Sequence, residues 1–250
     1  MIDNQMEENL ERNEEGKKEL RIKKSTLWIF FSVLVIVVLI ILWNPFGKPG
    51  GTTIDASQFL NNPALYPSLG PGNAKDTVIE FYDFQCPICG LASGLPGWSP
   101  SYSSNAGYNV SGQVEQAAEA GKIRFISVPM SFLDSRSDAT QKGSTWAAEA
   151  ALCANDQGKF WEMHDIIYSN QVTPAQEGVQ FTKQQLTSMA AQIQGMNQSQ
   201  FSDCLQTDKY LIKTQEITNA AFNAGVTGTP TFVINGKVLS DWTTAASILK

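Results

Sequence analysis

The 250-residue chain is predicted to form an α/β domain in which a long helical segment interrupts a β-sheet. Three observations predict this class: a β-branched and aromatic run at residues 77–82, helical patterns over about 136–224, and a return to strand at 231–234. This order is typical of an α/β sheet with a helical insertion. One domain over residues 76–250 is favoured over two independent ones.

Two further segments complete the predicted sheet. Residues 122–128 alternate in hydrophobicity and stop before a proline, as a strand does. Residues 231–234 and 237–239 flank Asn235-Gly236, the strongest short turn signal for a β-hairpin. The chain is therefore expected to close its sheet with an antiparallel hairpin.

Helical patterns fill the interval between these strands. The predicted helices of this interval cover residues 139–155, 159–168, 181–194, 199–205 and 208–224. Thr182 is a suitable N-cap for the third helix, and Gly225 is a stop signal after the last one. Asp241 is expected to cap a final helix that runs toward Lys250.

The N-terminal part is predicted to be a membrane anchor. Residues 27–43 are apolar except for Ser32 and would span roughly 26 Å of a hydrocarbon core about 30 Å thick. Basic residues are frequent before this run and sparse after it, so the positive-inside rule predicts a cytoplasmic tail at 1–26 and an extracytoplasmic remainder. Residues 44–75, rich in Pro, Gly, Asn and Ser, are predicted to be a linker with one short helix at 56–60. A cleaved signal peptide is the alternative, although no Ala-x-Ala site follows the apolar run.

Overall composition narrows the range of partners. The net charge of −6 and the pI near 4.9 argue against a nucleic-acid partner, which would require a basic face. The hydrophobic fraction of 42% is sufficient for a core. The chain has four cysteines, two of them in a C-x-x-C, and whether they can form disulfides depends on the redox compartment of the protein.

Cys86 and Cys89 form this C-x-x-C, directly after the first predicted strand. The intervening residues are Pro87 and Ile88, and Pro87 suits the first position of a helix because its missing N–H needs no partner there. Cys86 is thus expected at a helix N-terminus, where backbone N–H groups and the helix dipole favour the thiolate and lower its pKa below about 8.5. Cys89, one turn further on, is expected to be buried with a higher pKa. The motif therefore predicts a nucleophilic thiol and a resolving thiol.

A zinc site and an inert bridge are the competing interpretations of this motif. Zinc usually needs a second ligand pair, but Cys153 and Cys204 lie far apart in the sequence and His164 is the only histidine. A disulfide across so short a loop would stabilise the fold little. Neither a metal nor an organic cofactor is expected.

Cys153 and Cys204 both fall in the helical segment. In an oxidising compartment two spare thiols are normally paired, and closing a loop of about 50 residues would stabilise the fold by roughly 4 kcal/mol. We expect a structural disulfide, with a second redox pair as the alternative. His164 is expected to pack near Trp161, without a metal or general-base role.

Several motifs occur in a fixed order along the chain. They are Leu69-Gly70, Val78-Ile79-Glu80-Phe81, Cys86-Pro87-Ile88-Cys89, Trp146-Ala147-Ala148-Glu149-Ala150, the run 157–165 and the run 225–236. Together they resemble the DsbA-like branch of the thioredoxin fold, and most of all the membrane-tethered DsbA/BdbD-type proteins. The resemblance covers about residues 69–250. It implies a thioredoxin-like fold with an inserted helical subdomain and a protein thiol–disulfide oxidoreductase activity.

The resemblance also implies roles for individual residues. Pro230 would follow a cis peptide bond and lie beside the cysteines, and Thr229 would contact them and offer its backbone to the substrate chain. Glu80 would be a buried acid that accepts or relays the proton of Cys89. From the residues alone, Glu80 is a lone carboxylate on an apolar strand, so burial would raise its pKa. A position on an exposed sheet face is the alternative.

The segment after the motif departs from the family pattern. Glycines and a proline follow Cys89, so the helix is expected to last about two turns before a long Ser/Tyr/Gly loop. Helix is expected again at 114–120. A loop of this length is usually functional or disordered. Its aromatic residues Trp98, Tyr102 and Tyr108 suit peptide binding in a substrate groove.

The predicted activity is the introduction of disulfides into exported proteins that carry reduced cysteines. A membrane reoxidase of the DsbB or vitamin-K-epoxide-reductase type is the partner that the resemblance implies. The predicted location is the cell membrane, with a single pass, a cytoplasmic N-terminus and an extracytoplasmic catalytic domain. A reductase or isomerase with the same site, and a non-catalytic thioredoxin-like adaptor, are the alternatives.

Overall fold

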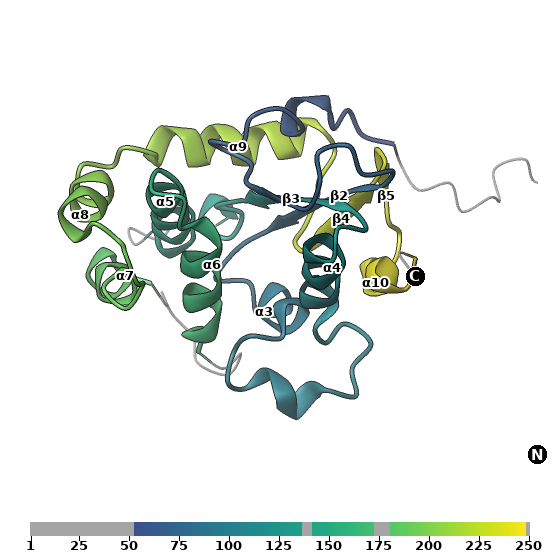
Figure 1. Cartoon of the computed structure of the whole chain (residues 1–250), viewed down its shortest axis with the longest axis horizontal. Helices are drawn as coiled ribbons and strands as arrows, with labels where there is room; N and C mark the ends of the chain where they lie inside the picture. The colour runs from purple at the N-terminus through teal and green to yellow at the C-terminus, as the bar shows by residue number, and fades with distance from the viewer. Residues whose placement is uncertain (1–52, 137–141, 173–180, 249–250) are drawn as a thin grey trace, which may run out of the picture. The chain divides into compact units, whose positions relative to one another are not determined.

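The computed structural model describes residues 53–136, 142–172 and 181–248 (Figure 1). The strands are β1 Ser68–Leu69, β2 Thr77–Tyr82, β3 Arg124–Pro129, β4 Thr231–Ile234 and β5 Lys237–Val238. They form one mixed sheet in the order β1-β3-β2-β4-β5, in which β2 and β3 are parallel and the other pairs are antiparallel. The predicted strands and the closing hairpin are confirmed.

Helices surround this sheet and fill the interval between β3 and β4. The α-helices are α3 Pro87–Ser93, α4 Val110–Glu119, α5 Gly143–Asn155, α6 Phe160–Ser169, α7 Lys183–Ala190, α8 Gln198–Gln206, α9 Leu211–Asn223 and α10 Ala245–Ile248. Short 3-10 helices cover Ser57–Phe59, Ser99–Tyr102, Asp134–Arg136 and Trp242–Thr244. The predicted α/β class, with helices interrupting a sheet, is confirmed.

The local signals explain most of the helix boundaries. Thr182 caps α7 in a capping box with Gln185, as an N-cap in front of a helix should. Asn235 and Gly236 both have positive φ, the conformation that a tight hairpin turn requires. The helix predicted from residue 208 instead begins at Leu211, because Asp208 has a φ of 56° and cannot continue a right-handed helix.

The two faces of the sheet are covered by different elements (Figure 1). Successive side chains of β2 point to opposite faces, since strand geometry has a period of two. Val78 packs with α4 and α10 on one face, whereas Ile79 and Phe81 pack with α9 on the other. β2 is therefore a central strand with both faces buried, and the residues that follow it begin in the interior of the fold.

The helices α5 to α8 form a second cluster beside the sheet (Figure 1). The buried alanines of α5 let its neighbours approach closely; they include Ala147, Ala150, Ala151 and Ala154. The predicted disulfide is present: Cys153 of α5 and Cys204 of α8 are bonded, with a Cα–Cα distance of 5.8 Å. The bond ties together the first and fourth helices of the insertion.

The folded part of the chain begins earlier than residue 76. Ile54, Phe59 and Tyr66 are buried in the core beneath α9, and the Phe59 ring contacts Phe81 edge-on. β1 pairs with the edge of β3. The described part of the segment predicted as a linker thus belongs to the domain, because its few apolar residues cover one face of the sheet.

The predicted cytoplasmic tail at 1–26, the anchor at 27–43 and residues 44–52 lie outside the described residues. Among the residues that the structure describes, no helix combines the length and apolar character needed to cross a membrane.

Candidate active site

Cys86 lies at the N-cap of α3, immediately beyond the end of β2. The turn that carries it is held by Asp83, whose backbone carbonyl accepts from the Cys86 N–H at 3.0 Å. Pro87 occupies the first turn of the helix, as its spacing predicts. α3 ends after two turns at Gly94, which has a φ of 74°, so the predicted short helix is confirmed.

The two cysteines are free thiols with different surroundings. Cys86 is 7% exposed and Cys89 is 0% exposed, while the Ile88 side chain between them is 46% exposed. The helix therefore leaves its first thiol with a small solvent exposure, next to an exposed apolar side chain, and keeps the second thiol fully inside.

The electrostatics of the pair are also asymmetric. The pKa of Cys86 is lowered to about 6, chiefly by the hydrogen bond from the Cys89 thiol and further by backbone N–H groups at the start of α3, against the opposing effect of burial. Burial, followed by the neighbouring Cys86, raises the pKa of Cys89 well above its usual value. The helix N-terminus thus contributes as expected, but the second thiol is the larger cause.

Thr229 and Pro230 reach the cysteines from the far end of the chain. They immediately precede β4, which pairs with β2, so the sheet brings them to the end of β2. The Thr229–Pro230 peptide bond is cis. The Cys86 thiol donates to the Thr229 carbonyl oxygen at 3.5 Å. The structure therefore brings together Cys86, Cys89 and the Thr229-Pro230 dipeptide.

Glu80 is buried on β2, on the face that carries α4. Its carboxylate accepts a hydrogen bond from the Ser111 hydroxyl of α4 at 2.8 Å. Burial raises the pKa of Glu80 to about 8, and the Ser111 bond only partly opposes this shift. The charge of Glu80 also raises the pKa of Cys89, so the two groups interact. The alternative of an exposed sheet face is wrong.

The raised pKa of Glu80 predicts a pH dependence of stability. Glu80 is protonated in the fold up to about pH 8, whereas its usual pKa is 4.5, so the folded state binds the extra proton between these values. The free energy of unfolding should therefore fall as pH rises through this window. Glu80→Gln should remove up to about 1.4 kcal/mol per pH unit of that slope.

Urea unfolding of the Glu80→Gln variant and the wild type at pH 5, 6, 7 and 8 measures this difference. Asp83 and Glu149, whose pKa values burial raises to about 7, keep a slope of the same sign in the variant. Parallel stability curves for the variant and the wild type would show that Glu80 is ionised in the folded protein.

Two residues around the motif were missed by sequence reasoning. Asp83 is buried and accepts from the backbone N–H groups of Gln85 at 2.8 Å and Leu133 at 2.9 Å. Gln171 donates from Nε2 to the carbonyl oxygen of Cys86 at 3.0 Å. Asp83 carried a signal, an acid between two aromatic residues, but nothing local distinguishes Gln171.

Gln171 also explains a glycine of the motif helix. A Cβ at Gly90 would overlap the side-chain oxygen of Gln171, so a larger residue there would displace the Gln171 side chain from its hydrogen bonds. The second bond of Gln171 Nε2, to the Phe84 carbonyl at 2.9 Å, holds the same turn. Gln171, which follows α6, thus connects the start of α3 to the helical insertion through these hydrogen bonds.

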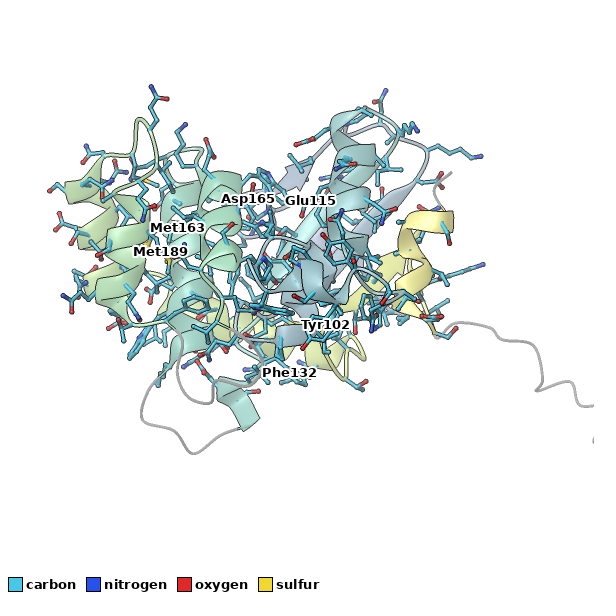
Figure 2. The ribbon with its side chains drawn as sticks, turned by 90° about the horizontal axis from the view of Figure 1, so that it is seen from below. Tyr102, Glu115, Phe132, Met163, Asp165 and Met189 are labelled. Atoms are coloured by element: carbon cyan, nitrogen blue, oxygen red, sulfur yellow. A yellow bond between two sulfur atoms is a disulfide. The ribbon has the colours of Figure 1, made fainter. Side chains whose placement is uncertain are left out.

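The predicted groove aromatics separate into two places. Trp98 donates from its indole N–H to the Gln171 carbonyl at 3.2 Å and stacks edge-on with Tyr102, at 5.8 Å between ring centroids. Tyr102 is 49% exposed on a 3-10 helix (Figure 2). Tyr108 is half-buried near the start of α4. Trp98 and Tyr102 are thus connected to the active-site turn through Gln171.

Within the described ranges, no group of three or more His, Cys, Asp or Glu side chains is placed to hold a metal ion.

A family model described as thioredoxin matches residues 105–250, more than half of the chain. The chain belongs to the thioredoxin family. The match covers the helical insertion, Thr229 and Pro230, and it begins after the C-x-x-C, so the motif itself adds evidence that is independent of the model.

Curated relatives extend this assignment. The thioredoxin-family chain is 25% identical over 223 residues to the probable disulfide bond formation protein D of Bacillus cereus, covering 86% of this chain and 90% of that protein. It is also 30% identical over 170 residues to the Na(+)/H(+) antiporter NhaA 1 of Salinispora arenicola. That match covers 67% of this chain but only 21% of the antiporter, so the chain spans about a fifth of that relative's length.

A solved structure shows the same fold. The oxidised form of BdbD from Bacillus subtilis superposes with a TM-score of 0.55 at 20% identity, covering 80% of this chain and 93% of that one. The predicted thioredoxin-like fold and the predicted relationship to DsbA/BdbD-type thiol–disulfide oxidoreductases are therefore confirmed.

Proposed function

We propose that this chain is an extracytoplasmic thiol–disulfide oxidoreductase that introduces disulfides into exported proteins. The observation that carries the proposal is the asymmetry of the cysteine pair. Cys86 is the more accessible thiol and its pKa is lowered to about 6, whereas Cys89 is fully buried and its pKa is raised. The similarity to a protein named for disulfide bond formation supports the same direction.

The reaction starts from the oxidised Cys86–Cys89 bridge. A substrate thiolate attacks Cys86 Sγ, a substrate–Cys86 disulfide forms, and the bond to Cys89 breaks. Cys89 leaves as a thiolate and takes a proton, because its thiolate is unfavourable in the interior. A second substrate thiolate then attacks the substrate sulfur, and Cys86 leaves as a stabilised thiolate. The substrate has lost two electrons, and the enzyme pair has gained them.

Glu80 is the proposed proton donor to Cys89 in the first step. Its raised pKa of about 8 keeps the carboxyl protonated near neutral pH, and its charge interacts with Cys89. Thr229 is the proposed docking point for the substrate backbone, since its carbonyl lies beside the Cys86 thiol. Pro230 holds that carbonyl in place at the start of β4.

The aromatic segment after α3 is the proposed docking surface for a protein substrate. Trp98 is anchored to Gln171, which itself bonds the Cys86 carbonyl, and Tyr102 packs on Trp98 with half of its side chain exposed. Tyr108 is proposed to border the same surface. Exposed aromatic side chains bind peptides well because they bury a large area with few rotors.

Tyr102→Ser should lower kcat/KM for an unfolded protein substrate about tenfold, which corresponds to about 1.4 kcal/mol of lost binding. The rate with glutathione disulfide, a small substrate that offers no extended chain to bind, should stay within about twofold. Ile212→Ser is the matched control, because Ile212 is an exposed apolar residue on α9, outside the proposed surface. Deletion of residues 98–110 should likewise impair activity on the protein substrate more than on glutathione disulfide. If either variant lost the same activity on both substrates, the docking role would be wrong.

We further propose that residues 27–43 anchor the chain in the cell membrane, with residues 1–26 in the cytoplasm. A membrane reoxidase of the DsbB or vitamin-K-epoxide-reductase type would restore the Cys86–Cys89 bridge. The apolar run and the basic residues before it support this orientation. Protease added to intact cells should cleave the extracytoplasmic domain but not a tag at the N-terminus; the reverse pattern would invert the topology.

Transfer of the disulfide tests the proposed function. The oxidised chain, mixed at equal concentration with a reduced and unfolded two-cysteine protein, should form that protein's disulfide and become reduced itself. Mass spectrometry after thiol alkylation measures both products. A chain that leaves this substrate reduced but, when reduced itself, cleaves the disulfides of insulin would be a reductase.

A further inference from the structure

Buried Glu80 needs a path to exchange its proton with solvent. It is enclosed between β2 and α4, and its described hydrogen-bond partner is Ser111. Four residues beyond Ser111, and therefore on the same face of α4, lies Glu115. The helix thus places a second carboxyl group one turn away from the group that binds Glu80.

Glu115 connects the interior with the surface. Its Oε1 atom is buried and has no hydrogen-bond partner within the described part of the chain, although the side chain as a whole is 17% exposed. A buried carboxyl oxygen without a partner is costly, so such a group usually has a function or carries a proton. The Oε1 atom of Glu115 thus lies in the interior, while another part of the same side chain is in contact with solvent.

His164 of α6 supports Glu115 from the opposite side. Its Nε2 lies 4.0 Å from Glu115 Oε1, and its Nδ1 lies 2.9 Å from Asp165 Oδ1. The imidazole is almost fully buried, whereas the Asp165 side chain is 54% exposed. Figure 2 shows Glu115 and Asp165 near each other, and their charges interact. A second polar route from this position to the surface therefore runs through the histidine.

The charged and titratable groups around this position come from three elements. Glu115 interacts with Glu80 of β2, with His164 and Asp165 of α6, and with Glu119 of its own helix. The His164 ring also contacts Tyr82 of β2 and Tyr168 of α6, which form the rest of its enclosure together with Phe84, Phe160 and Trp161.

Protonation of Glu115 depends on that of Glu80. Burial raises the pKa of Glu115 to about 7, the charge of His164 opposes this shift, and the charge of Glu80 adds to it. When one carboxyl loses its proton, its negative charge therefore raises the pKa of the other, which then holds or takes up a proton more readily. Glu80 and Glu115 therefore both have pKa values near neutral pH, which suits the transfer of a proton between them at neutral pH.

We propose that Glu115, held against His164, is the group through which buried Glu80 exchanges its proton with solvent during disulfide transfer. The inference rests on the proposed function. When Cys89 leaves as a thiolate, Glu80 gives it a proton and becomes a carboxylate. Glu115 then passes a proton to Glu80, by way of the Ser111 hydroxyl that already contacts Glu80. Glu115 is reprotonated from solvent, either directly or through His164, so one proton enters for each Cys89 released.

The test measures single-turnover reaction of the oxidised full chain with a synthetic one-cysteine peptide from pH 5.5 to 8.5, in H2O and in D2O. Glu115→Gln keeps the size of the side chain but cannot carry the proton. Glu162→Gln is the matched control, an exposed acid on α6 that pairs with Lys159. The equilibrium constant with glutathione is determined for each variant, because it reports an effect of charge alone.

Glu115→Gln should react about tenfold more slowly at pH 7, lose the pH dependence centred near 7 and show a larger solvent isotope effect. Its glutathione equilibrium should stay within about threefold, and Glu162→Gln should match the wild type. If Glu115→Gln reacted as fast as the wild type, or if its slower rate were explained entirely by a shifted glutathione equilibrium, the proton route would be wrong. The proposed function would be unaffected by that result. A wild-type chain that leaves the peptide unmodified would contradict the proposed function and the route with it.

Discussion

Cys86→Ala is expected to lower the rate of disulfide transfer by at least about a thousandfold, because removal of an attacked or attacking group abolishes the covalent step. Cys86 is the accessible thiol of the pair, and its thiolate is the stabilised one. Cys89 cannot replace it, since that thiol is fully buried with a raised pKa. The transfer assay with a reduced two-cysteine protein measures the loss.

Cys89→Ala separates the two steps. In this variant the Cys86 thiolate can still attack a substrate disulfide, but no second thiol releases the product. A stable mixed disulfide between Cys86 and the substrate should accumulate and appear by mass spectrometry under non-reducing conditions. If the mixed disulfide accumulated in the Cys86→Ala variant instead, Cys89 would be the nucleophile and the assignment of Cys86 would be wrong. Full biological function without Cys86 would favour the adaptor alternative.

Removal of the Cys153–Cys204 disulfide is expected to lower the free energy of unfolding by about 4 kcal/mol in the chain-entropy model. The bond closes a loop between residues 51 positions apart and joins α5 to α8 within the helical cluster. The double variant Cys153→Ala/Cys204→Ala measures the effect by urea unfolding, with transfer to the one-cysteine peptide as a second readout.

The same double variant tests whether this bond is structural. A structural bond predicts reduced stability with peptide transfer unchanged at a temperature where the variant stays folded. A variant that keeps its stability but loses transfer would identify a second redox pair. The single variant Cys204→Ala should be at least as destabilised as the double variant, because it leaves Cys153 buried without its partner.

Local sequence signals were sufficient for the parts of the fold that depend on neighbouring residues. The β2 strand is rich in β-branched and aromatic residues, and Asn235-Gly236 specifies the turn between β4 and β5 almost alone. Cys86 follows from its spacing, since a strand, a C-x-x-C and a proline at the first helical position are adjacent in the chain. Pro230 could be placed only through the resemblance to a family.

Long-range contacts escaped the sequence because no local period encodes them. Gln171 and Cys86 are joined by a hydrogen bond although they lie 85 positions apart in the sequence, and Ser111 and Glu80 meet only when α4 covers the sheet. His164 was correctly expected beside Trp161, but its proximity to Glu115 depends on how α4 and α6 pack. Residues 53–75 were mistaken for linker because their apolar residues are few and separated by turn residues.

The reduction potential of the Cys86–Cys89 pair shows whether this pair oxidises or reduces its substrates. It follows from the equilibrium between the chain and glutathione, measured by alkylation of free thiols. A stabilised Cys86 thiolate favours the reduced pair, so the potential is expected to be oxidising, close to about −120 mV. A potential close to about −270 mV would contradict this expectation, since the pair would then donate electrons to its substrates.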